Sequence, residues 1–176
     1  MDADPVVLIV PTTSLAAEFQ AMVEEFRRAG EASYQHYRDQ IRVDFPAYVR
    51  WIESLRAGNP ARPDLAPESM FWLVRDGHTV LGGSRLRYGL TPRTAQIGGH
   101  IGYDIRPSAR RQGYGTRLLA LTLDRARGAG LARVLITCDT ANSASVRIIE
   151  KNGGLLENRI IDPDSGEAVS RYWIAL

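Results

Sequence analysis

Residues 101–119 read IGYDIRPSARRQGYGTRLL, and this stretch decides the fold. Its first half has the apolar and aromatic residues of a strand, and a short loop with Arg110 and Arg111 follows. Gly113 and Gly115 then open a helix. Glycine lets a backbone approach a ligand closely, and the first turn of a helix has unpaired N–H groups at the positive end of its dipole. The stretch therefore predicts an anion site, and the two arginines favour a diphosphate.

The hydrophobic period changes several times on either side of this stretch. Alternating or continuous apolar runs predict strands at residues 6–10, 70–74, 79–88, 97–105, 133–138, 155–161 and 168–174. Helical spacing, capping residues and terminal glycines predict helices at residues 15–29, 46–57, 113–129 and 142–152. Residues 31–44 are expected to be loop or broken helix, and the proline-rich residues 58–68 an extended loop. A three-strand meander that leads into a β-α-β unit indicates an α/β (α+β) fold with a mixed sheet.

Composition limits the class of protein. The 176 residues fit one domain, with 44% hydrophobic and 24% charged residues, which excludes disordered and fibrous classes. Cys138 is the single cysteine, so the chain forms no internal disulfide and no Cys-based zinc site, and we expect no metal. The net charge is only +2, and the arginines are interleaved with acids, so we expect no nucleic-acid partner.

The start of the chain bears on its location. It begins Met1-Asp2-Ala3-Asp4 without a basic region, and its first apolar run is too short to cross a bilayer. We therefore expect a cytoplasmic protein with neither a signal peptide nor membrane contact.

Three kinds of phosphate loop compete for the glycine stretch. A P-loop requires Gly-Lys-Ser/Thr, and no lysine is present in this stretch. A dinucleotide-binding fingerprint requires a third glycine where this chain has Leu118, although Asp139 lies near the position of the acidic residue.

The third kind matches. Arg110-Arg-Gln-Gly113-Tyr-Gly115 resembles the Arg/Gln-x-x-Gly-x-Gly/Ala signature of the GNAT superfamily of acyl-CoA-dependent N-acetyltransferases. Asn142-Ser-Ala-Ser145 with Glu150-Lys151-Asn-Gly153 resembles the last helix of that superfamily. Short matches at residues 98–103, 106–108 and 171–174 resemble a group of predicted acetyltransferases of unassigned acceptor.

This resemblance implies a single GNAT domain over residues 1–176. It has a mixed, mostly antiparallel sheet of about seven strands flanked by about four helices. Residues 69–176 would form the CoA-binding core, and residues 1–68 an N-terminal strand, helices and acceptor-side region.

The resemblance also implies the residues that bind acetyl-CoA. The backbone of the strand end would pair with the pantetheine arm, a nearby N–H would polarise the thioester carbonyl, and the glycine loop would hold the pyrophosphate. The expected cofactor-binding residues are Ile105, Arg106, Arg110, Arg111, Gln112, Gly113, Tyr114, Gly115, Thr116, Asn142 and Ser145. Asn142 also suits a helix N-cap.

The proton-transfer groups depart from the family pattern. GNAT enzymes often have a tyrosine in the last helix that acts as the general acid, and this chain has Ile149 at that position. Tyr172 and Tyr103 are the substitutes, although Tyr172 also suits a packed strand. His100 is the expected general base, because it lies on the strand that leads to the glycine loop and has a suitable intrinsic pKa. Asp104 shares the same face of that strand. The alternative for His100 is a core histidine that bonds to the backbone.

The resemblance implies an acyltransferase that moves an acetyl group directly from acetyl-CoA to a primary amine of a small molecule or peptide. The alternative is a CoA- or acyl-CoA-binding module without turnover. We expect the acceptor pocket to lie among the N-terminal helices, residues 58–68 and the last hairpin. Asp64 and Glu68 in the loop would attract a cationic amine, and a solvated loop is the alternative explanation for these two acids. A homodimer is expected from the family.

Overall fold

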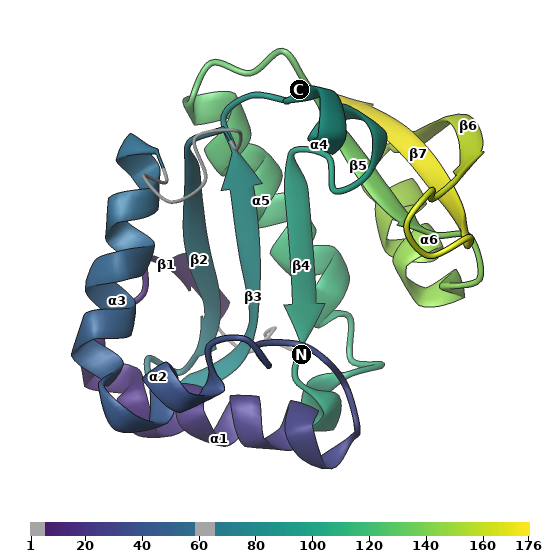
Figure 1. The fold of residues 1–176 in the computed structure, drawn as a ribbon. Coiled ribbons are helices and arrows are strands. Elements are labelled where there is room, and N and C mark those ends of the chain that lie inside the picture. Colours follow the sequence, from purple (N-terminus) through teal and green to yellow (C-terminus); the bar gives the residue numbers. More distant parts are fainter. Residues whose placement is uncertain (1–5, 59–65) are drawn as a thin grey trace.

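The computed structural model describes residues 6–58 and 66–176, and its strands form two antiparallel sheets (Figure 1). The first sheet has the order β1-β2-β3-β4, with β1 (Val6–Ile9), β2 (Glu68–Arg75), β3 (Thr79–Arg87) and β4 (Ile101–Ile105). The second has the order β5-β7-β6, with β5 (Arg133–Asp139), β6 (Leu155–Ile161) and β7 (Ala168–Ala175).

The two sheets meet where β4 begins and then separate. The N–H of His100 donates to the carbonyl of Leu135 at 2.7 Å, and the N–H of Leu135 donates to Nδ1 of His100 at 2.8 Å. Beyond this junction β4 and β5 diverge (Figure 1). The far end of β4 therefore has one edge paired with β3 and one edge without a partner among the described strands.

Helices cover both faces of the first sheet. On one face lies α5 (Tyr114–Gly128), where Thr122 Oγ1 contacts Ser84 Oγ of β3 at 2.8 Å. The other face packs against α1 (Ala16–Arg28), α2 (Arg38–Val43) and α3 (Phe45–Ser54), whose core includes Phe19 stacked on Trp72 of β2. The remaining helices are α4 (Pro92–Gln96), before β4, and α6 (Ser143–Lys151), between β5 and β6.

The register of β3 and β4 decides which side chains face the N-terminal helices. Gly83 pairs with Asp104 and Arg85 with Gly102, so Arg85 and Asp104 lie on the same face of adjacent strands. Tyr103 lies on the opposite face, toward α6, where its hydroxyl contacts Ser145 Oγ at 2.8 Å. Asp104 and Tyr103 therefore emerge on different sides of the same unpartnered edge.

The fold class and nearly all predicted elements are confirmed, with two corrections. The strand predicted at residues 97–105 begins only at Ile101, because Gly98 and Gly99 have φ of 105° and 58° and turn the chain. The structure has six α-helices in its described part rather than about four. The short α2 lies in the segment expected to be loop or broken helix, and the short α4 lies between two predicted strands, where no element was predicted.

Candidate functional site

The loop before α5 presents backbone N–H groups to the cleft. Arg111 and Gly113 have positive φ of 64° and 85°, and the helix begins after Gly113 without a side-chain cap. In the described chain no hydrogen-bond acceptor is found for the backbone N–H groups of residues 112–116. Successive free N–H groups at a helix N-terminus are suited to bind an anion, which is the role that the sequence predicts for this loop.

This loop forms one wall of a cavity of about 570 Å³, here called the first cavity. The other walls come from the end of β4 and from α6. It is lined by Ile105, Arg110, Arg111, Gly113, Gly115, Thr116, Asn142 and Ser145 among the predicted binding residues. Asn142 also caps α6, because its Oδ1 accepts from the N–H of Ser145 at 3.0 Å.

Three predicted cofactor-binding residues do not line the first cavity. The N–H of Arg106 donates to the carbonyl of Leu81, and its buried guanidinium pairs with Glu25, so Arg106 anchors α1 to the sheet. Gln112 donates through its side chain to the carbonyl of Ser108, and the Tyr114 hydroxyl accepts from Arg75.

Arg110 lines the first cavity, but its guanidinium is fully engaged. Its Nη atoms bind both carboxylate oxygens of Glu31 at 2.7 and 2.8 Å, and its Nε donates to the carbonyl of Ile105 at 2.9 Å. The same contact holds the pKa of Glu31 below its ordinary value. Arg110 therefore positions the loop against the end of α1 and is not a free cation.

The unpartnered edge of β4 presents different residues from those expected. His100 and Arg106 both bond to β3 through their backbone, and antiparallel pairing alternates. The backbone groups of Tyr103 and Ile105 consequently point away from β3, toward the gap. Tyr103 and the N–H of Ile105, rather than Ile105 and Arg106, are placed to bond an extended ligand, because the Ile105 carbonyl already accepts from Arg110.

A second cavity, of about 330 Å³, lies on the side of the N-terminal helices. Its apolar wall comes from Tyr34, Tyr37, Tyr48 and Met70, and its polar wall includes Arg85 and Arg87 of β3. Tyr103 and Asp104 line both cavities. The two cavities therefore adjoin at the point where β4 separates from β5.

Asp104 has the most unusual charge environment at this junction. Its burial raises its pKa to about 6, against weaker lowering by bonds from the Tyr34 hydroxyl and the Gly83 N–H and by the charges of Arg85 and Arg110. The Tyr34 hydroxyl donates to Oδ1 of Asp104 at 3.1 Å. A carboxylate with a pKa of about 6 is ionised at neutral pH and binds a proton more strongly than an ordinary aspartate, which suits a general base.

Tyr103 carries a proton on the opposite side of the junction. Its burial raises its pKa to about 12, so the phenol is protonated at neutral pH. It bonds Ser145 of α6, whose side chain lines the first cavity. Tyr103 can therefore hold a proton at the boundary between the two cavities.

The two predicted catalytic residues are not brought to either cavity. Nδ1 of His100 accepts from Leu135, so its other nitrogen carries the proton in the neutral ring and no lone pair is free. Burial lowers the pKa of His100 further. Tyr172 is 3% exposed within the core of the sheet, and Ile149 is fully buried. The geometry favours Asp104 and Tyr103 over His100 and Tyr172, and it matches the alternative reading of His100 as a core histidine.

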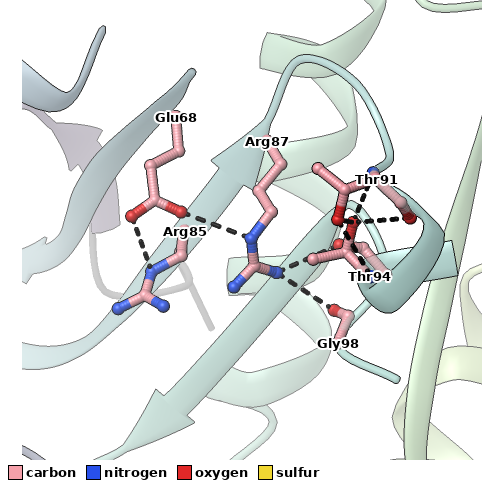
Figure 2. Close-up of polar contacts among 7 residues, drawn as sticks. Glu68, Arg85, Arg87, Thr91, Thr94 and Gly98 are labelled. Atoms are coloured by element: carbon pink, nitrogen blue, oxygen red, sulfur yellow. Dashed lines mark hydrogen bonds and ion pairs between the residues drawn. The ribbon is translucent and has the colours of Figure 1, made fainter. Parts of the chain in front are cut away.

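The acidic loop residues also need correction. Glu68 is not in a loop: it opens β2, is 7% exposed and lies between Arg85 and Arg87 (Figure 2). Asp64 and most of the predicted extended loop lie outside the described residues. The last hairpin, expected at the acceptor pocket, contributes no residue to the lining of the second cavity in the part of the chain described.

Sequence reasoning missed two sets of cations. Arg147 and Lys151 lie one turn apart on α6 and line the first cavity beside Arg111. Their spacing of four residues was the available signal. Arg85 and Arg87 alternate along β3 and could have been recognised as sharing a face, but nothing in the sequence shows that this face borders a cavity.

The described residues also bear on membrane-spanning helices and on metal-binding clusters. No helix within residues 6–58 and 66–176 is long and apolar enough to cross a bilayer. No group of three or more His, Cys, Asp or Glu side chains in those ranges is placed to bind a metal.

Comparison with known proteins points to one family. Residues 12–154 match the family model described as the acetyltransferase (GNAT) domain. No curated protein matches the chain.

Solved structures share the fold at low identity. The microcin C7 self-immunity acetyltransferase MccE, in complex with acetyl-CoA and AMP, has a TM-score of 0.71 at 13% identity over 99% of this chain and 94% of that one. Mycobacterium smegmatis RimJ, with CoA-disulfide, has a TM-score of 0.71 at 15% identity over 97% and 81%. A chimera of the spermidine N-acetyltransferase SpeG from Vibrio cholerae has a TM-score of 0.65 at 14% identity over 97% and 95%.

Proposed function

The chain belongs to the GNAT acetyltransferase family, and from this premise we propose that it transfers an acetyl group from acetyl-CoA directly to a primary amine of a small molecule or peptide. The observation that carries the proposal is the junction of two cavities at Tyr103 and Asp104. Direct transfer requires both substrates to be bound at once with their reacting atoms adjacent. Two cavities that share one pair of polar residues provide that arrangement.

The first cavity fits the chemistry of acetyl-CoA. Free N–H groups of residues 112–116 and the cations Arg111, Arg147 and Lys151 suit a pyrophosphate and a further phosphate. The outward backbone groups of Tyr103 and the outward N–H of Ile105 suit an extended amide-bearing arm, which would add to β4 like another strand. When bound, acetyl-CoA supplies the acetyl group as an activated thioester, and the MccE structure contains that molecule in a similar fold.

The second cavity suits the amine. An alkylammonium has a pKa of about 10.4, so it must lose a proton before it can attack. In our proposal Asp104 Oδ accepts that proton, directly or through a water, while the Tyr34 hydroxyl holds the carboxylate in place. The Tyr103 hydroxyl holds the proton for the departing sulfur, and Ser145 fixes its direction. In this proposal Tyr103 takes the role of the tyrosine that the family often has in α6, where this chain has Ile149.

Release of CoA thiol tests the proposal. Purified protein is incubated with acetyl-CoA and pooled primary amines, and thiol is measured with a colorimetric reagent after subtraction of amine-free hydrolysis. Amine-dependent release supports turnover, and division of the pool identifies the acceptor. Thermal stabilisation by acetyl-CoA without release from any amine would instead favour the alternative, a CoA-binding module without turnover.

The cytoplasmic location and the homodimer stay predictions. Gel filtration with light scattering measures the second directly.

A further inference from the structure

Two arginines of β3 that line the second cavity, Arg85 and Arg87, share one carboxylate, that of the buried Glu68. The carboxylate of Glu68 lies between two guanidiniums, with Oε1 3.5 Å from Nε of Arg85 and Oε2 3.3 Å from Nε of Arg87 (Figure 2). Glu68 meets both arginines at their Nε atoms, which leaves the terminal nitrogens of each guanidinium for other partners.

The two arginines have different roles. Nη1 of Arg87 donates to the carbonyl oxygens of Gly98 and Gly99 at 3.2 and 3.0 Å, and the side chain is 11% exposed, so Arg87 holds the turn before β4. The side chain of Arg85 is 34% exposed and lines the second cavity. Its terminal nitrogens point away from Glu68 (Figure 2), and no hydrogen bond to them is found among residues 6–58 and 66–176. Arg85 therefore presents a guanidinium that is free to bind a ligand.

Arg85 and Asp104 lie within reach of one small molecule. Asp104 is opposite Gly83, and Arg85 is two residues further along β3 on the same face. Diagonal neighbours of this kind lie about 7–8 Å apart, with their Cβ atoms somewhat closer. The charge of Arg85 contributes to lowering the pKa of Asp104, which agrees with this proximity. The second cavity is thus lined by the carboxylate of Asp104 and, at the diagonal position on the adjacent strand, by the guanidinium of Arg85.

We propose that the acceptor is an amine with a carboxylate or phosphate a few bonds from its nitrogen, and that Arg85 binds this anion while the amine faces Asp104. The inference rests on the proposed function and narrows its substrate class. A planar guanidinium binds carboxylate or phosphate with two parallel hydrogen bonds, so it orients as well as attracts. A polycation such as spermidine would place a second ammonium against Arg85 and is excluded. A free amino acid and the acidic N-terminal residue of a peptide share the required chemistry.

Matched pairs of amines test the inference. Each pair differs only in the anion: β-alanine and propylamine, phosphoethanolamine and ethanolamine, and tetrapeptide amides that begin with Asp or Asn. We expect kcat/KM for the anionic member to be about tenfold higher or more, as charge-assisted bonding implies. A preference in the first two pairs indicates a small-molecule acceptor, and a preference only in the third indicates an N-terminal residue. Equal rates within all three pairs would overturn the inference.

Variants assign the preference to Arg85. Arg85→Met should remove it, Arg85→Lys should keep part of it, and Arg127→Met, which removes an exposed cation at the far end of α5, should leave it intact. Calorimetry should give the same Kd for acetyl-CoA in all three variants, which shows that they are folded. An undiminished preference in Arg85→Met would refute the role of Arg85.

The design separates failure of the inference from failure of the proposed function. If no member of any pair releases thiol, binding is measured by calorimetry with CoA-loaded protein and the same six amines. Binding of the anionic members that Arg85→Met weakens about tenfold supports the inference although turnover has failed. Absence of such binding overturns it.

Discussion

Replacement of Asp104 by asparagine should impair activity and raise stability at the same time. The pKa of this carboxyl is raised from its ordinary 3.8 to about 6 by burial. At 1.36 kcal/mol for each tenfold change in proton affinity, this rise means that ionisation costs the folded state about 3 kcal/mol. Asparagine has the same shape, still accepts from Tyr34 and carries no charge.

The sign of the stability effect follows from proton binding. Between pH 4 and pH 6 the folded protein binds more protons at this site than the unfolded chain does, so stability falls as the pH rises through this range. At pH 7.5 the unfolding free energy of Asp104→Asn should exceed that of the wild type by up to about 3 kcal/mol, and at pH 4 the difference should fall to about 0.5 kcal/mol. Urea unfolding at both pH values measures this.

The kinetic effect has its own pH signature. A base with a pKa of about 6 should give the wild type a kcat/KM about tenfold lower at pH 5 than at pH 7. Asp104→Asn should lose about 100-fold or more in kcat and lose this acid limb. Asp39→Asn, on the exposed surface of α2, is the matched control and should change neither. A hydrazide acceptor, whose nitrogen is already neutral at pH 7, should be affected far less.

Several outcomes would refute the reasoning. If Asp104→Asn keeps wild-type kcat with an unchanged acid limb, Asp104 is not the base. If the variant is less stable at pH 7.5, the carboxylate is stabilised by its surroundings and the raised pKa is wrong.

Three further predictions test other parts of the site. Tyr103→Phe should lower kcat about tenfold or more without changing the Kd of acetyl-CoA, whereas Tyr172→Phe should leave kcat within about twofold; the reverse result would restore Tyr172 as the acid. Arg111→Ala combined with Lys151→Ala should raise the Kd of CoA about tenfold at low salt and less at high salt, as measured by calorimetry; a salt-independent Kd in the wild type would count against phosphate binding by these cations. His100→Phe should lower the unfolding free energy by about 1–3 kcal/mol, because the N–H of Leu135 loses its acceptor, while kcat per folded molecule is retained; a folded but inactive variant would support His100 as the base.

Local patterns predicted those features that depend on local physics. The strand, glycine loop and helix of residues 101–119 were recognisable because glycine at a helix start and alternation in a strand act over a few residues. Four of the predicted loop residues, Arg111, Gly113, Gly115 and Thr116, accordingly line the first cavity.

Features that depend on long-range packing could not be predicted in this way. His100 joins β5 because Gly98 and Gly99 turn the chain ahead of β4, and nothing nearby in sequence marks Leu135 as its partner. The guanidinium of Arg106 bonds to Glu25 instead of lining the first cavity, and Glu25 lies on α1, about 80 residues earlier in the sequence. The polar wall at Arg85 depends on the packing of the N-terminal helices over β3. In each case the decisive contact joins segments far apart in sequence.

The most direct test of the central claim follows the acetyl group itself. Acetyl-CoA labelled in the acetyl carbons is incubated with the protein and the preferred amine, and the products are analysed by mass spectrometry. The account predicts that the label appears on the nitrogen of the amine in a one-to-one ratio with released CoA, and that Asp104→Asn suppresses both together. Label found only as free acetate, or retained in acetyl-CoA that is bound but never consumed, would contradict transfer between the two cavities.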